Sequence, residues 1–76
     1  MAKIYVATLS VFVMGAHRDL EALKEAVTPQ GLAYADHDRH EWVPEDYCGL
    51  RLKYVNSGTG RWNKTDWLIT EVELPE

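Results

Sequence analysis

Two histidines and one cysteine in the middle of the sequence have side chains that can bind a metal ion. His37 and His40 are separated by two residues, and Cys48 follows after seven more. Imidazole and thiolate are common ligands of Zn²⁺, and two histidines at this spacing can share one ion. The pattern matches no strong zinc signature, however, and a closed structural site needs four ligands. We therefore expect no metal ion and no cofactor, with the histidines in a solvated loop and the cysteine as a small buried residue.

Residues that act as nucleophiles and bases are present, but no pattern connects them. Ser10, Ser57 and Cys48 are candidate nucleophiles beside three histidines. The sequence contains no nucleophile elbow, phosphate-binding loop or HExxH motif. Because a chain this short rarely encloses a substrate pocket, we expect a protein that is not an enzyme.

The strongest charge feature is an acidic stretch over residues 36–47. It holds five acids and one base, and its net charge of −4 equals that of the whole chain. Carboxylates interleaved with aromatic rings suit docking onto a basic groove of another protein, because the charges steer and the rings anchor. The alternative is a solvated loop whose aromatic rings fold down onto the protein itself. The candidate protein-binding residues are Asp36, Asp38, Glu41, Trp42, Glu45, Asp46 and Tyr47.

A basic stretch follows, in which residues 51–65 hold four bases and no acid. Aromatic side chains between bases can stack on nucleotides while the cations hold phosphates. Arg61, Trp62 and Lys64 are the candidate nucleic-acid-binding residues of this alternative. The acidic charge of the whole chain makes nucleic acid the less favoured partner.

Composition and length set the limits for all of these candidates. The 76 residues are 46% hydrophobic and 26% charged, as in an ordinary globular protein, and form one domain over residues 1–76. This length excludes a doubly wound nucleotide-binding fold and a barrel enzyme. One cysteine excludes an internal disulfide framework. Since a core of this size is marginal, the domain must pack well or borrow surface from a partner.

The apolar run over residues 4–14 predicts the principal strand, over 3–14. It is too short to span a bilayer, and Thr8 and Ser10 at alternate positions oppose a secretory signal. We expect a cytoplasmic protein without a membrane partner. A strand that is apolar on both faces is normally covered on both. One face therefore takes a helix, and the other takes the middle segment or a second copy of the chain.

A helix is predicted over residues 18–27, with Asp19 as its N-cap. Leu20, Leu23 and Val27 recur at helical spacing, and Thr28-Pro29 is expected to end the helix. Residues 30–48 are the least regular stretch, with a possible short strand over 32–35.

Residues 49–56 and 66–74 predict a hairpin. The expected register sets Arg51 opposite Glu73 and Lys53 opposite Glu71, which pairs opposite charges and turns Ile69 outward. The loop 57–65 is long and rich in glycine. The fold class is therefore α+β: a three- or four-stranded, mainly antiparallel sheet with one helix packed on one face.

In size and charge this acidic, aromatic-rich chain resembles the small inhibitors that bacteriophages make against host machinery or CRISPR defence. This likeness of type is carried by no motif and assigns no residues. It implies a non-enzymatic interaction module that binds a larger protein through its acidic and aromatic surface. The alternative is a small protein that binds RNA or single-stranded nucleic acid, and a homodimer is compatible with both.

Overall fold

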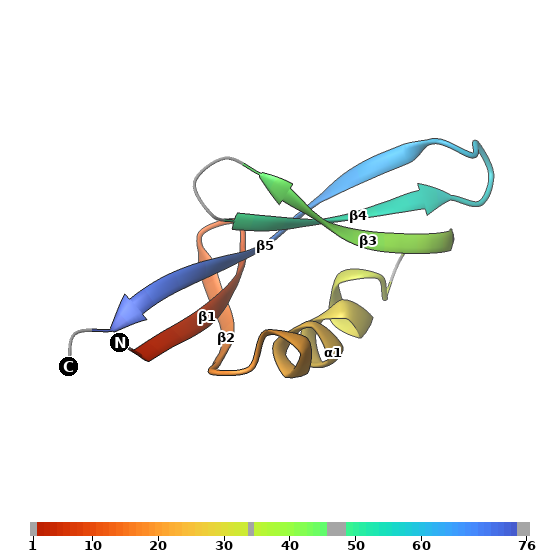
Figure 1. Cartoon of the computed structure of the whole chain (residues 1–76). Coiled ribbons are helices and arrows are strands. Elements are labelled where there is room, and N and C mark those ends of the chain that lie inside the picture. Colours follow the sequence, from red (N-terminus) through yellow and green to blue (C-terminus); the bar gives the residue numbers. More distant parts are fainter. Residues whose placement is uncertain (1, 34, 46–48, 75–76) are drawn as a thin grey trace.

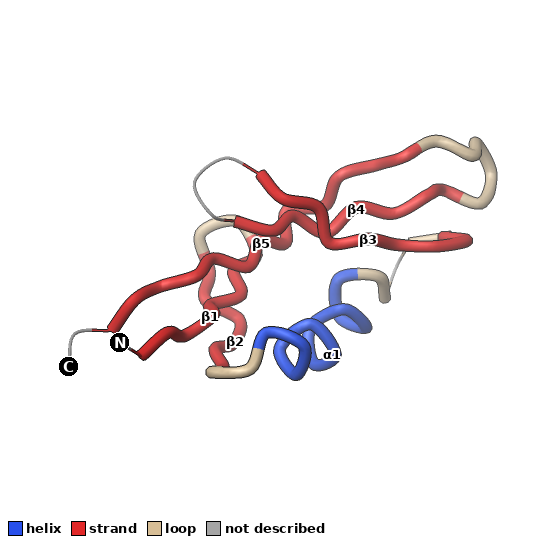
Figure 2. The backbone as a smooth tube through the Cα atoms, in the orientation of Figure 1, coloured by secondary structure: helices blue, strands red, loops and turns tan. Residues whose placement is uncertain are grey.

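The computed structural model describes residues 2–33, 35–45 and 49–74. In chain order, its elements are β1 (Ala2–Leu9), β2 (Phe12–His17), α1 (Leu20–Gly31), β3 (His37–Glu45), β4 (Gly49–Asn56) and β5 (Trp62–Leu74). The described strands form one five-stranded sheet in the order β2-β1-β5-β4-β3, and every pair is antiparallel. Helix α1 lies on one side of this sheet (Figures 1 and 2). The α+β class is confirmed, while the expected three or four strands and their order are wrong in detail.

Strand β5 holds the two halves of the sheet together. It is 13 residues long, and its first part pairs with β4 while its last part pairs with β1. Figure 1 shows this strand running from the β4–β5 turn to the chain termini. Within the sheet, the hairpins β1–β2 and β3–β4 are therefore joined through one central strand.

The expected single strand over residues 3–14 is two strands joined by a turn. The turn falls at Ser10 and Val11, where Ser10 has a φ of 56° and its N–H donates to the carbonyl of Asp66 at 3.1 Å. The apolar pattern continues through this turn without Gly or Pro. The prediction was wrong because hydrophobic alternation carries no mark where the chain reverses.

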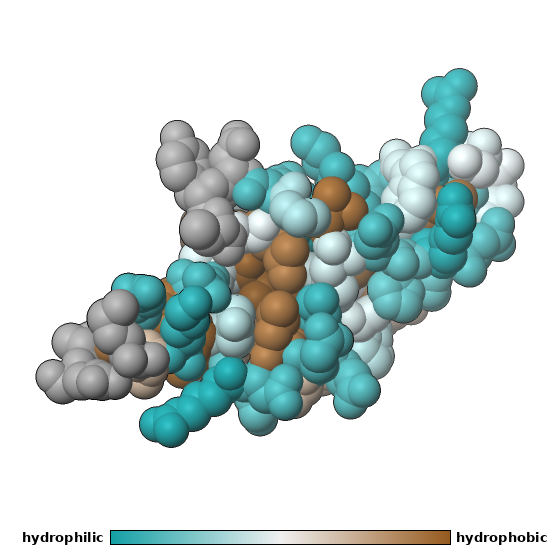
Figure 3. All heavy atoms as spheres, in the orientation of Figure 1, coloured by the Kyte–Doolittle hydropathy of each residue, from teal (hydrophilic) through white to brown (hydrophobic). Residues whose placement is uncertain are grey.

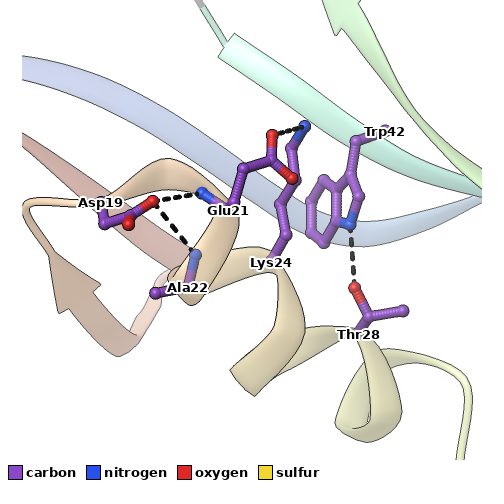
Figure 4. A network of polar contacts seen from close by, with 6 residues as sticks. All are labelled: Asp19, Glu21, Ala22, Lys24, Thr28 and Trp42. Carbon is purple, nitrogen blue, oxygen red and sulfur yellow. Dashed lines mark hydrogen bonds and ion pairs between the residues drawn. The ribbon is translucent and has the colours of Figure 1, made fainter.

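The predicted N-cap of α1, Asp19, is confirmed, although the helix begins at Leu20 rather than at residue 18. The Asp19 carboxylate accepts hydrogen bonds from the backbone N–H groups of Glu21 at 2.9 Å and Ala22 at 3.3 Å (Figure 4). The helix does not end at Thr28-Pro29 but continues to Gly31. A proline in the last turn removes one hydrogen bond only, and packing against the sheet outweighs that loss.

The core lies between α1 and the face of the sheet turned toward it, here called the inner face. Each buried member of this cluster is at most 7% exposed: Ala7, Leu23, Val27, Leu32, Leu52, Trp67 and Ile69. Leu23 and Val27 are the helical positions that the sequence periodicity predicts. Ile69 was expected to face outward, but it is 1% exposed on the inner face.

The predicted pairing of β4 with β5 is wrong. Arg51 lies opposite Leu68, and Lys53 lies opposite Lys64. Strand β5 begins at Trp62, inside the expected loop, and its glutamates lie opposite β1 instead. The argument from opposite charges assigned Glu71 and Glu73 to the bases of β4. Strand β1 also offers these glutamates a base, Lys3, and it is β1 that they lie opposite.

The middle segment, expected to be irregular, forms the edge strand β3. Leu32 and Ala33 form a turn after α1 rather than a strand, and residues 37–45 then pair along β4. Residues 37–45 of this segment therefore extend the sheet at its edge and do not fold across a face.

Candidate binding surfaces

The predicted acidic residues lie along the β3 edge of the sheet. Asp36, Asp38 and Glu41 are exposed there. Glu45 is half-buried, and its Oε1 lies 2.8 Å from Nε of Arg51. This contact is an ion pair without hydrogen-bond geometry, because Nε has no hydrogen-bond partner. The carboxylates of Asp36, Asp38 and Glu41 are thus accessible to a partner, while that of Glu45 forms an ion pair between β3 and β4.

Trp42, the predicted aromatic anchor, is turned toward α1. Its indole N–H donates to Oγ1 of Thr28 at 3.0 Å, and its ring packs against the core cluster (Figure 4). The neighbouring Glu41 points to the opposite side of the strand, because side chains alternate along β3. Asp46 and Tyr47 lie outside the described residues. The structure therefore places Glu41 and Trp42 on opposite sides of β3.

The predicted basic residues Arg61, Trp62 and Lys64 are exposed at the β4–β5 turn and along the start of β5. The guanidinium carbon of Arg39 lies 5.3 Å from the centre of the Trp62 ring, within the range of a cation–π contact. Arg39, on β3, was not among the predicted site residues. It lies 23 positions away in sequence, and only the pairing of β3, β4 and β5 brings it to the ring.

The residues between Arg39 and Trp62 complete a small platform. Val55 of β4 lies opposite both, and it is 8% exposed beneath them. Beside it on β4, Lys53 lies between Glu41 of β3 and Lys64 of β5. Opposite charges across neighbouring strands stabilise a sheet, and like charges destabilise it. The position of Lys64 opposite Lys53 is therefore not explained by the stability of the fold. We call Arg39, Val55 and Trp62 the Trp62 platform.

The face of the sheet turned away from α1, here called the outer face, is largely apolar across β1 and β5. Ala7 and Ile69 lie opposite each other in the core, so their sequence neighbours point to the outer face. Val72 is 39% exposed there. No described helix or loop segment lies on this side of the sheet (Figures 1 and 2). Where β1 and β5 pair, the outer-face residues are Ala2, Ile4, Val6, Thr8, Leu68, Thr70, Val72 and Leu74.

The histidines do not form a metal site with other described residues. The rings of His37 and His40 are 6.2 Å apart and edge-on, and Nδ1 of His37 lies 3.1 Å from the carbonyl oxygen of Ala35. Cys48 lies outside the described residues. Across residues 2–33, 35–45 and 49–74, no three His, Cys, Asp or Glu side chains are placed to hold a metal ion.

One cavity of about 290 Å³ opens beside the N-terminal end of α1. Apolar side chains are visible in the middle of this side of the molecule, between hydrophilic ones (Figure 3). The two carboxylates that line the cavity already have partners: Glu45 pairs with Arg51, and Glu71 lies 3.5 Å from the Lys3 ammonium and accepts from the Tyr5 hydroxyl at 3.4 Å. Both are thus held in structural contacts, which gives no support to acid–base chemistry at this cavity.

Comparison of the chain with protein-family models, with curated proteins and with solved structures finds no match. Within the described part of the chain, no helix combines the length and the apolar character that crossing a membrane requires.

Proposed function

We propose that this chain is a small, non-enzymatic protein-binding module that docks onto a larger protein through the outer face of its sheet. One observation carries the proposal: the outer face is apolar, and residues 37–45 of the middle segment, which was a candidate to cover it, lie within the sheet as β3. Contiguous exposed apolar surface is rare on monomeric proteins and usually marks an interaction site.

The chemistry of this face describes the partner. Its apolar part spans β1 and β5, and the Trp62 platform lies nearer the β4–β5 turn, separated from this part by the pair of Lys53 and Lys64. Tryptophan and arginine are the side chains that most often dominate binding energy at protein interfaces. We infer a partner surface with an apolar centre and carboxylates at one end, opposite Arg39 and Lys64.

The exposed acids Asp36, Asp38 and Glu41 have a secondary role in this proposal. They border the docking face at the β3 edge, where they would speed encounter with a basic region of the partner. Inhibition of host machinery, as by the small phage proteins, is the biological role that we attach to the proposal, and its support is size and charge alone. A cytoplasmic location belongs to the same proposal.

The test is affinity capture from a nuclease-treated bacterial lysate, followed by mass spectrometry. The variant Val72→Arg places a charge in the apolar face at an exposed position, and Ala26→Arg makes the same kind of change on an exposed position of α1. We expect one stoichiometric protein that Ala26→Arg retains and Val72→Arg loses. A partner that survives Val72→Arg but is lost when Asp36 and Asp38 are changed to Lys would assign docking to the acidic edge instead.

A second candidate function, nucleic-acid binding, is favoured by the corrected register. The expected glutamate partners of Arg51 and Lys53 lie against β1, and Lys64 is brought beside Lys53 near the Trp62 platform. An exposed indole surrounded by cations is typical of a site for single-stranded nucleic acid. The bases stack on the ring, and the cations neutralise the phosphates. Fluorescence anisotropy with labelled single-stranded RNA tests this. The variant Lys64→Ala should reduce the salt dependence of binding by about one unit of slope, and the helical control Lys24→Ala should leave it unchanged.

A further inference from the structure

The two edges of the sheet are protected to very different degrees. Strand β2, at one edge, has no charged residue from Phe12 to Ala16. Phe12, Val13 and Met14 are 66%, 70% and 42% exposed. An open strand edge with apolar side chains is a template for pairing with another strand.

Strand β3, at the other edge, carries several features that prevent such pairing. It has a register shift between His37 and Arg39, and Pro44 near its end provides no N–H. Its charged side chains are Asp38, Arg39, Glu41 and Glu45. Charges, a bulge and a proline are the devices by which natural sheets block edge-to-edge association. Strand β2 also has a register shift, beside Met14, but it has no proline and no charge from Phe12 to Ala16, so it is the less protected edge and the one that can accept a strand.

We propose that β2 pairs with β2 of a second copy of this chain, antiparallel and across a two-fold axis. The two sheets then become one continuous ten-stranded sheet, with α1 of each copy on the inner face. Such a contact is isologous, so a single patch forms both sides of the interface. This inference does not depend on the proposed outer-face partner, because the edge and the face are different surfaces.

Side-chain size within β2 argues for a second copy as the occupant. The bulky residues stand in the first half of the strand and the small residues Gly15 and Ala16 in the second half. An antiparallel pair centred between Met14 and Gly15 sets Val13 opposite Ala16 of the second copy, and Met14 opposite its Gly15. Val13 and Met14 then each meet a small residue, and Phe12 lies opposite His17 of the second copy, a cross-strand pair of aromatic rings of the kind that stabilises a sheet.

Charge argues in the same direction. The acidic edge β3 is the far edge of the sheet, so in this dimer the two β3 strands are separated by nine strand spacings, about 43 Å. That distance is several times the screening length of roughly 8 Å at physiological salt. In the same register Arg18 lies opposite Val11 of the second copy and Asp19 opposite its Ser10, so no like charges meet. The net charge of −4 on each copy therefore opposes this pairing only weakly.

The expected affinity is modest. The strand is 6 residues long, and a register shift against β1 beside Met14 limits the regular ladder. Such an edge buries less than the roughly 800 Å² per partner of a standard interface. We expect a dissociation constant in the micromolar range, on the order of 10 µM.

Sedimentation equilibrium over a protein concentration series from about 1 µM to about 1 mM tests this. Wild-type protein should convert from monomer to dimer, and Met14→Lys should weaken the dimer at least about tenfold, because it places an ammonium in the two-fold interface. The control Val72→Arg, on the outer face, should dimerise like wild type. Wild-type protein that stays monomeric overturns the proposal, as does a dimer lost in Val72→Arg but kept in Met14→Lys.

A cross-linking measurement covers the case in which Met14→Lys fails to fold. Val13→Cys and Ala16→Cys, each made together with Cys48→Ser, are mixed and oxidised. Opposite residues in an antiparallel ladder have Cα atoms about 4.5–5.5 Å apart, within disulfide range. The mixture should form a dimer linked by a disulfide between the two introduced thiols, and a mixture of Val72→Cys with Ala16→Cys should not. Equal cross-linking of the two mixtures would contradict the β2–β2 contact.

Discussion

The inner and outer faces of the sheet are built by alternate residues of the same strands, yet their residues differ in how far they are exposed. On the inner face Ala7 and Ile69 are 0% and 1% exposed beneath α1. On the outer face Val72, three positions along β5 from Ile69, is 39% exposed. Apolar character is therefore shared by both faces, and only the single helix distinguishes core from surface. No described helix or loop covers this second apolar face, and we therefore propose it as a surface for another molecule.

The difference in burial between the two faces is tested by truncating one side chain on each face and comparing the losses in the free energy of unfolding. Leu52→Ala removes a side chain that is 0% exposed and should lower the free energy of unfolding by about 2–5 kcal/mol. Val72→Ala should cost less than about 1 kcal/mol, because much of its side chain already contacts water. Urea denaturation followed by circular dichroism measures both. Equal losses in the two variants would show that the outer face is buried in solution.

A glycine-to-alanine comparison asks how closely α1 sits on the inner face. A Cβ at Gly31 would lie 2.6 Å from Cδ2 of Leu52 and 3.2 Å from Cδ1 of Trp67, whereas a Cβ at Gly15 would meet nothing nearer than 3.6 Å. Gly31→Ala should therefore destabilise the fold by about 1–3 kcal/mol, despite the better helix propensity of alanine. Thermal unfolding of Gly31→Ala beside Gly15→Ala measures the difference. A neutral Gly31→Ala would mean that the end of α1 can move away from the sheet.

The parts of the fold that the sequence predicted are those decided by nearby residues. The N-cap Asp19 and the buried positions Leu23 and Val27 follow from local hydrogen bonding and helical spacing. The turn at Ser10 and the continuation of α1 past Pro29 were missed. In both, contacts with distant segments outweigh the local preference, as in the bond from Ser10 to the Asp66 carbonyl.

The candidate sites were harder to predict because each depends on pairing between distant strands. Trp42 could have faced either side of its segment until β3 was known to pair with β4. Arg39 reaches Trp62 across an intervening strand, so no spacing in the sequence marks the pair. The hairpin register failed for the same reason, since Lys53 and a residue of β1 compete for Glu71.

Removing the N-cap of α1 should destabilise the packing of α1 on the inner face without changing any core side chain. Asp19→Ala should lower the free energy of unfolding by about 1 kcal/mol, because two backbone N–H groups of α1 lose their acceptor. Asp19→Asn keeps an acceptor oxygen and should cost much less. Chemical denaturation of both variants checks this. An equal loss in Asp19→Asn would assign the effect to the negative charge near the helix N-terminus and not to the hydrogen bonds.

The smallest effect on stability is expected at the Trp62 platform, where a substitution should weaken partner binding more than it lowers the free energy of unfolding. An exposed cation–π contact is worth about 0.5–1 kcal/mol, so Arg39→Ala should change the free energy of unfolding by no more than that. A double-mutant cycle with Trp62→Leu, which keeps an apolar cover over Val55, isolates the coupling between the two side chains. If the platform belongs to the docking face, Arg39→Ala should weaken partner capture far more than it weakens folding. Equal and small effects on both would confine the docking face to the apolar residues of β1 and β5.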